Sequence, residues 1–288
     1  MPHIAIITDT DSSLPLDLAE KYKIVQVPIN VQFGDESYRD VYDIDNAAVF
    51  ARINQDGKLP TTAAPSPGNF IEAFNSAFAS GADQILCLTI SSEVSAVYTA
   101  ARTAAEMFTG KIIKVVDSRT LTFAEGLMAI EAARVIAEGA SMDEAITAAE
   151  ELRDRSHLFA ALSTLKYLAM SGRVGQVAAG FASLLDVKPI LALRNEKLEM
   201  LERIRTQSKA WERLIELAIE ATGGLPVDQL CILHIDAPQA AGLFEQKLRA
   251  ALPCPQEIRH IEMTPGLSIH MGAGTVGFVL VTKKDIPI

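Results

Sequence analysis

Apolar and polar residues in the first half of the chain alternate between two patterns, short β-branched runs and longer stretches with helical spacing. The β-branched runs predict strands or extended segments at residues 3–8, 24–33, 84–90 and 111–116. The stretches with helical spacing predict helices after the first strand and at residues 45–55, 67–80, 91–108, 122–138 and 142–156. A strand followed by a helix, repeated in this way, predicts a parallel sheet with helices on both faces.

The pattern changes after about residue 157, where strands and helices no longer alternate regularly. Helices are predicted at 159–173, 176–187, 206–222 and 237–251, a β-hairpin at 188–204, and strands at 228–235, 257–263 and 277–283. This order favours a mixed sheet. The sequence therefore predicts a two-domain α/β fold, with an N-terminal parallel-sheet domain over residues 1–157 and a C-terminal mixed-sheet domain over residues 158–288.

The amino-acid composition argues against several classes of binding partner. The chain has 288 residues, of which 49% are hydrophobic and 22% charged, as in an ordinary globular protein. Its formal charge of −10 argues against nucleic acid and anionic membrane surfaces as partners. No apolar run is long enough for a membrane span, and no His or Cys spacing indicates a metal site. Three cysteines, far apart in the chain, indicate reduced thiols and a cytoplasmic location: Cys87, Cys231 and Cys254.

Three glycines near the C-terminus, Gly272, Gly274 and Gly277, have the G-x-G-x-x-G spacing of a dinucleotide-binding motif. That motif needs a helix after the glycines and an acidic residue about 20 positions later. Here a β-branched run follows at once and the chain soon ends. We therefore expect the glycines to form a tight turn that positions His270 rather than a nucleotide site.

Two acidic residues, Asp9 and Asp11, follow the first predicted strand and suggest one alternative function. Paired carboxylates at a strand end suit Mg²⁺ and phosphoryl transfer, as in haloacid-dehalogenase phosphatases. Those enzymes need a further acidic pair at a later strand end, and the strand at 111–116 supplies Asp117 alone. The other interpretation is that Asp9 and Asp11 cap the following helix.

Hydroxyl side chains gather at the starts of two predicted helices. Ser91 and Ser92 end a strand and are predicted to cap a helix, with Ser95 in its first turn, where free amides favour a small anion such as a carboxylate. Thr62 precedes the second helix, which Ser66 is predicted to cap. Capping accounts for Ser66 and Ser92, but it does not account for Ser95.

Seven segments in a fixed order resemble the DegV family, and together they span nearly the whole chain: "IAIITDTDSSLPLDLAEKYKIVQVPINVQFGDESYRD", "TAAPSPGNF", "ISSEVSAVYTAA", "VVDSRT", "LKYLAMSGRV", "LLDVKPIL" and "GAGTVG". The resemblance implies a two-domain α/β protein that sequesters one long-chain fatty acid without a cofactor and catalyses nothing alone. It also implies a role as the acyl-binding subunit of a fatty-acid kinase. A separate ATP-dependent kinase subunit would then convert the bound carboxyl group to acyl phosphate for phospholipid metabolism.

The resemblance also implies which residues contact the ligand. The carboxylate ligands correspond to Thr62 and Ser95, with Ser92 beside them and His270 nearby. Arg173, in the family's Gly-Arg pair, corresponds to a residue near the head group and the kinase-docking face. This chain departs from the family where Ala63, Ala64, Ala96 and Val97 replace more polar or smaller residues, which makes the predicted walls more apolar.

Overall fold

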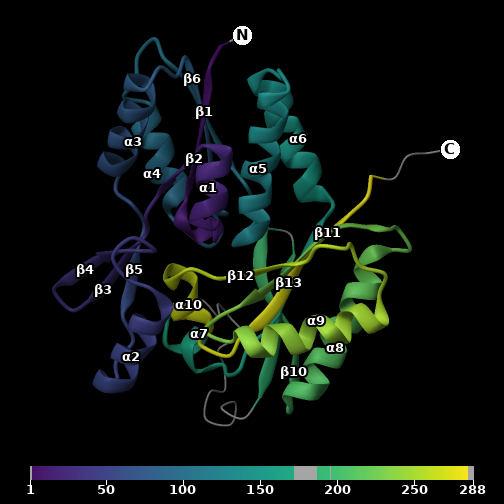
Figure 1. The fold of residues 1–288 in the computed structure, drawn as a ribbon. Helices are drawn as coiled ribbons and strands as arrows, with labels where there is room; N and C mark the ends of the chain where they lie inside the picture. The colour runs from purple at the N-terminus through teal and green to yellow at the C-terminus, as the bar shows by residue number, and fades with distance from the viewer. Residues whose placement is uncertain (1, 172–186, 195, 285–288) are drawn as a thin grey trace. The chain divides into compact units, whose positions relative to one another are not determined.

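The computed structural model describes residues 2–171, 187–194 and 196–284, and the chain forms two compact units (Figure 1). Unit 1 contains Met1–Ile44 and Thr62–Asp154, and unit 2 contains Asp45–Thr61 and Arg155–Ile288. Within the described residues, no helix is both long enough and apolar enough to cross a membrane. The division at residues 157 and 158 remains a prediction from the sequence.

Unit 1 is built on a four-stranded parallel sheet in the order β2-β1-β6-β7. Its strands are β1 (Ile4–Asp9), β2 (Ile24–Val27), β6 (Gln84–Thr89) and β7 (Ile112–Asp117). Helices α3 (Pro67–Ala79) and α4 (Val97–Ala105) lie on one side of the sheet, and α5 (Phe123–Ala137) and α6 (Met142–Asp154) lie on the other (Figure 1). The predicted parallel sheet with helices on both faces is confirmed.

Two short elements follow β1 before the chain returns to the sheet, the 3-10 helix η1 (Thr10–Ser12) and α1 (Leu16–Tyr22). The extended segment predicted at 24–33 is two strands, β2 and β3 (Asn30–Phe33). The chain leaves the parallel sheet between them, at Pro28, which has no N–H to donate to a ladder. β3 then forms a separate small sheet, in the order β4-β3-β5, with β4 (Glu36–Arg39) and β5 (Thr61–Ala63).

Helix α3 shows how local sequence fixes an element in unit 1. The Ser66 side chain accepts from the Asn69 N–H, and the Asn69 side chain in turn accepts from the Ser66 N–H. Pro67 occupies the first turn, where its missing N–H has no helical partner to lose. Phe70 and Phe74, one turn apart, are fully buried. The predicted cap at Ser66 is confirmed.

Unit 2 is built on a six-stranded mixed sheet in the order β10-β9-β8-β13-β11-β12. Its strands are β8 (Ser156–Ala161), β9 (Lys188–Arg194), β10 (Lys197–Ile204), β11 (Val227–His234), β12 (Arg259–Glu262) and β13 (Val276–Thr282). Helices α8 (Gln207–Thr222) and α9 (Pro238–Ala251) pack against the sheet, around a core that includes Trp211, Leu214, Phe244 and Phe278 (Figure 1). Unit 2 also contains α2 (Asn46–Asp56), α7 (Lys166–Met170) and α10 (Pro265–Met271).

One predicted helix in unit 2 is wrong. The stretch 159–173 begins in strand β8, which pairs with β9 on one side and β13 on the other, and among its described residues, 159–171, only α7 is an α-helix. A strand buried in the middle of a sheet is apolar without alternation, so its sequence resembles a buried helix. The hairpin predicted at 188–204 is confirmed as β9 and β10. The helix predicted at 176–187 lies almost entirely outside the described residues.

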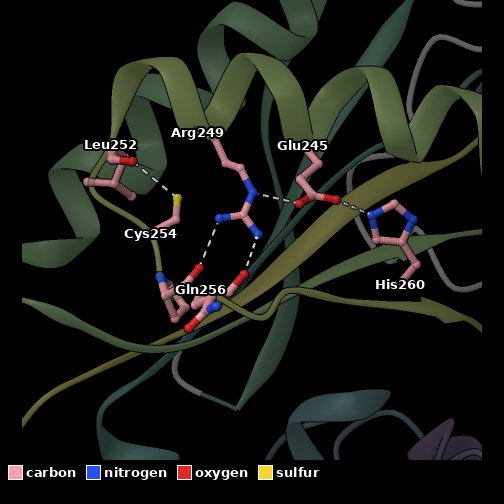
Figure 2. Close-up of polar contacts among 7 residues, drawn as sticks. Glu245, Arg249, Leu252, Cys254, Gln256 and His260 are labelled. Atoms are coloured by element: carbon pink, nitrogen blue, oxygen red, sulfur yellow. Dashed lines mark hydrogen bonds and ion pairs between the residues drawn. The ribbon is translucent and has the colours of Figure 1, made fainter.

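A polar network joins helix α9 to the loop and edge strand that follow it (Figure 2). Glu245 Oε1 accepts from Arg249 Nε at 2.7 Å, and Glu245 Oε2 lies 2.6 Å from His260 Nε2 on β12. Arg249 also donates to the main-chain carbonyls of Pro255 and Gln256, at 2.9 and 3.1 Å. His260 thus has a structural role, since its ring ties β12 to helix α9.

Candidate functional site

The loop after β6, residues 90–96 and here named the serine loop, carries Ser91, Ser92 and Ser95. Its main chain is held by carboxylates from the strands on both sides of β6. Asp9, at the end of β1, accepts from the Ile90 N–H through Oδ2 at 2.9 Å. Asp117, at the end of β7, accepts from the Ser92 N–H at 3.2 and 3.3 Å. The carboxyl ends of parallel strands thus bring three loops together at one edge of the sheet.

The loop after β7 also forms a hydrogen bond with the main chain of the serine loop. Thr120 accepts from the Ser91 N–H at 2.8 Å through its carbonyl. Two residues of this loop, Arg119 and Thr122, have φ of 56° and 51°. Such values are strained for residues that have a Cβ, and most of all for β-branched Thr122. The strained backbone persists because the surroundings hold it, and Thr122 Oγ1 donates to Ser13 Oγ at 3.0 Å.

Ser95 lies before helix α4, not in its first turn. The helix begins at Val97, and its N-terminal capping residue, Ala96, makes no side-chain capping bond. The Ser95 and Val94 N–H groups both donate to the Ser91 carbonyl, and Ser91 Oγ accepts from the Glu93 N–H. The prediction that Ser92 caps a helix whose free amides surround Ser95 is therefore wrong. A tight turn around Ser91 positions Ser95 instead.

Thr62 and Ser95 both belong to unit 1, and both are half-buried. Thr62 is the middle residue of β5, just before the Ser66 cap of α3. Ser92 is exposed, although its N–H is fixed by Asp117. Thr62 thus lies on a strand, and Ser92 and Ser95 lie on a loop whose main chain is fixed by hydrogen bonds. Their role as ligands of a carboxylate remains a prediction.

Two fully buried acids, Asp9 and Glu125, lie behind the serine loop as neighbours whose pKa values depend on each other. Thr8 Oγ1 also donates to Glu125 Oε1 at 2.8 Å. Burial raises the pKa of Asp9 to about 7, and burial together with the Asp9 charge raises the pKa of Glu125 well above its usual value. Sequence reasoning missed Glu125, although an acid inside the apolar stretch "FAEGLMA" is a recognisable signal.

The same contacts leave the phosphatase alternative unsupported. Asp9 uses one oxygen for the Ile90 N–H and the other for the Asp11 N–H, so it holds main chain rather than facing an open site. Asp9 caps the short 3-10 helix η1, whereas α1, the helix that Asp9 and Asp11 were expected to cap, begins after Pro15 without a side-chain cap. In the part of the chain that the structure describes, no group of three or more His, Cys, Asp or Glu residues is arranged to hold a metal ion.

His270 belongs to unit 2 and lies in the last turn of α10, a helix that the sequence did not predict. The helix ends at Gly272, where φ is 84°. A Cβ at Gly272 would overlap the Tyr167 ring, at 2.6 Å from Cε2. Gly272 thus allows the chain to turn beneath Tyr167 immediately after His270.

The other two glycines of the motif serve different purposes. Gly274 continues the turn with φ of 81°, and the Ala273 carbonyl accepts from Ser163 Oγ at 2.5 Å. Gly277 lies in β13, where a Cβ would overlap the Phe159 carbonyl and lie 2.8 Å from Ala160 Cβ. The hypothesis that all three glycines position His270 therefore needs correction, since Gly277 is required by the packing of β13 on β8. Arg173, the fifth predicted site residue, lies outside the described residues.

The fold and these loops define a two-domain α/β protein with a polar site built at the strand ends of a parallel sheet. The chain belongs to the DegV family, since the family model described as "Uncharacterised protein, DegV family" matches residues 3–283. A DegV domain-containing protein of Streptomyces coelicolor is 35% identical over 281 residues, which are 98% of this chain and 99% of the relative. The predicted family is confirmed.

Solved structures of the family share the whole fold. A DegV family protein from Thermus thermophilus, described for its fatty acid binding, matches with a TM-score of 0.89 at 29% identity, over 98% of this chain and 100% of its own. DegV from Bacillus subtilis, described as a fatty acid binding protein, matches with a TM-score of 0.87 at 28% identity, again over 98% and 100%. The predicted two-domain α/β fold is confirmed.

Proposed function

We propose that this protein binds one long-chain fatty acid and catalyses no reaction by itself. The observation that carries the proposal is the full-length match to the Thermus thermophilus and Bacillus subtilis proteins, both described as binding fatty acids. The described thiols are free, which agrees with the cytoplasm as the site of action. No second function is proposed, because Asp9 is committed to main-chain contacts.

Hydroxyl groups on the held loops are suited to the fatty-acid carboxylate. In the proposed complex, Thr62 and Ser95 donate to the carboxylate oxygens, with Ser92 and His270 as further ligands. Such bonds mainly orient the head group, while burial of the tail supplies most of the affinity. Fourteen methylenes at about 0.8 kcal/mol each give about 11 kcal/mol before ordering losses of several kcal/mol.

A ligand held this tightly should survive purification. We expect organic extraction of the protein, expressed in bacteria and purified natively, to release about one fatty acid per chain, measured by mass spectrometry against a labelled standard. Delipidated protein should take up added palmitate or oleate. An extract without stoichiometric lipid, together with no uptake of either acid, would show that the proposal is wrong.

The second part of the proposal is presentation to a separate kinase subunit. The bound carboxylate oxygen would attack the γ-phosphorus of ATP on that subunit, forming acyl phosphate while ADP leaves. The lipid-binding chain would contribute by holding the carboxyl group in a fixed position, which lowers the entropic part of the barrier. Arg173 is our choice for contacting the kinase or the transferred phosphoryl group, since a guanidinium is always charged and presents a planar fork of donors.

Arg173→Ala separates lipid binding from presentation. We expect lipid content and melting temperature to stay close to wild type, while acyl-phosphate formation with kinase subunit and ATP falls at least about tenfold, the loss of one charge-assisted contact. Arg194→Ala, which removes an exposed arginine of unit 2, is the matched control and should leave phosphorylation unchanged. A variant that melts several degrees lower but is phosphorylated normally would make Arg173 a structural residue.

A further inference from the structure

The buried acids Asp9 and Glu125 have no part in the proposed contacts with the fatty acid, yet they lie directly behind the serine loop. Asp9 Oδ2 accepts from the Ile90 N–H at 2.9 Å, and Oδ1 accepts from the Asp11 N–H at 3.0 Å. Both side chains are completely buried. One carboxylate therefore joins the end of β1 to the first residue of the serine loop, 81 positions later in the chain.

Close packing brings Glu125 against this carboxylate. Helix α5 approaches η1 so closely that a Cβ at Gly126 would lie 2.9 Å from the Ser12 carbonyl oxygen. The preceding residue, Glu125, accepts a hydrogen bond from the Thr8 hydroxyl through Oε1. Within the described structure, Oε2 receives no hydrogen bond from any N–H or O–H donor. The Asp9 carboxyl group is its neighbour, and a hydrogen bond between two carboxyl groups would need a proton on one of them.

Among the described residues, the charges that shift the pKa of the pair come from other acids. The titratable groups whose charge bears on it are Asp11 on η1, Asp40 after β4 and Cys87 on β6, all of them acidic. β2 contributes the neutral Gln26, and the charged residues of α1 and α6 are exposed or half-exposed. Two buried acids this close do not both ionise near neutral pH. Asp9 accepts two main-chain N–H donors, which favour its charged form, so the proton belongs on Glu125.

We propose that Asp9 and Glu125 act together as positioning residues for the serine loop, with Glu125 protonated and donating to Asp9, whose oxygens hold the main chain of Ile90 and Asp11. The proposal rests on the proposed fatty-acid site, because the loop it positions carries Ser95. It adds a buried proton, carried by Glu125, to the groups that maintain that site. Asp9 is a positioning residue in this account and does not contact the ligand.

We expect opposite results for palmitate binding from two isosteric variants, one at each acid. Glu125→Gln keeps an acceptor for Thr8 and a donor for Asp9, so the positioning contacts survive. Asp9→Asn replaces one acceptor oxygen by an NH2 group, so either Ile90 or Asp11 loses its acceptor. At pH 8, above the pKa of Asp9, we expect Glu125→Gln to bind palmitate within about twofold of wild type. Asp9→Asn should bind at least about tenfold more weakly.

Hydrogen exchange tests the positioning without any ligand. In Asp9→Asn, amide exchange in residues 90–95 should speed up at least about tenfold while the peptides of α5 and α6 keep their protection. Leu152→Ala, which removes a buried side chain of α6, is the matched control for lost stability in unit 1. It should leave exchange in residues 90–95 slow.

The pH dependence of unfolding tests the proton itself. Because the pKa of each acid is raised by folding, the folded protein holds more protons than the unfolded chain between about pH 5 and pH 7, and stability falls as pH rises. Glu125→Gln should make this dependence shallower by about one proton, a tenfold smaller change in the unfolding equilibrium constant per pH unit.

The results of these experiments distinguish failure of the positioning proposal from failure of the proposed fatty-acid binding. If Asp9→Asn keeps slow exchange in residues 90–95 and Glu125→Gln leaves the pH dependence unchanged, the positioning proposal is overturned. If none of the proteins binds a fatty acid, the proposed function fails, and exchange and the unfolding profile still decide whether Asp9 and Glu125 hold the loop as described.

Discussion

Ser95→Ala should weaken fatty-acid binding by about 1.5–3 kcal/mol, or about 10- to 150-fold in Kd, because a hydrogen bond to a charged carboxylate is stronger than a neutral one. The turn that holds Ser95 uses its main-chain N–H and not its hydroxyl, since the N–H donates to the Ser91 carbonyl. Alanine should therefore keep the loop in place and remove only the contact with the ligand. Isothermal titration with palmitate on delipidated protein measures the change.

A second serine in the same unit provides the control. Ser76 lies exposed on α3, so Ser76→Ala removes the same hydroxyl from a helix face and should bind palmitate like wild type. Both variants should melt within a degree or two of wild type, because exposed and half-buried hydroxyls contribute little to unfolding free energy. If correctly folded Ser95→Ala binds as tightly as Ser76→Ala, then Ser95 only shapes the turn and the head group is bound elsewhere.

Gly277→Ala should lower the free energy of unfolding by about 3 kcal/mol or more, as overpacking does when it strikes immovable neighbours. The new methyl group would overlap the Phe159 carbonyl and crowd the Ala160 backbone on β8, directly opposite in the ladder. Main chain inside a six-stranded sheet has little freedom to shift. The expected result is a lower urea midpoint, or loss of soluble folded protein, with the pairing of β8 and β13 disturbed.

Gly242→Ala is the matched control and should have the opposite sign. Gly242 lies within α9, and a Cβ built there has no neighbouring atom within 4 Å. Alanine should stabilise the helix by about 0.5–1 kcal/mol, since glycine loses more backbone entropy on folding. Equal unfolding midpoints for the two variants would contradict the packing account of Gly277.

Helices and strands were predictable where a cap, a turn or a regular hydrophobic period in their own sequence marks them. Ser66 followed by Pro67 marks the start of α3, and the hairpin pairs two strands that are neighbours in the sequence, β9 and β10. Strand-then-helix repetition gave the parallel sheet of unit 1 for the same reason, because each element carries its own periodicity. Strand β8 was predicted as helix because a strand buried on both faces has no alternation to distinguish it.

The candidate site was predictable only in part. The hydroxyls of Thr62 and Ser95 are predicted as ligands because they stand beside helix starts and match the DegV pattern. The start of α4 was placed too early, because the sequence does not reveal that a turn around Ser91 uses the first amides. The short helix α10, which carries His270, was missed because seven residues give too little periodicity to recognise.

Sequence alone determined the family, the α/β class and the helix and strand boundaries that caps and turn residues mark. Only the tertiary structure decided that Asp9 would meet Ile90, that Glu125 would become a buried neighbour of Asp9, and that Gly277 would lie against Phe159. Each of these contacts joins residues about 80 to 120 positions apart. Local periodicity and capping act over one or two turns of chain, so they do not specify which distant side chains become neighbours in a close-packed interior.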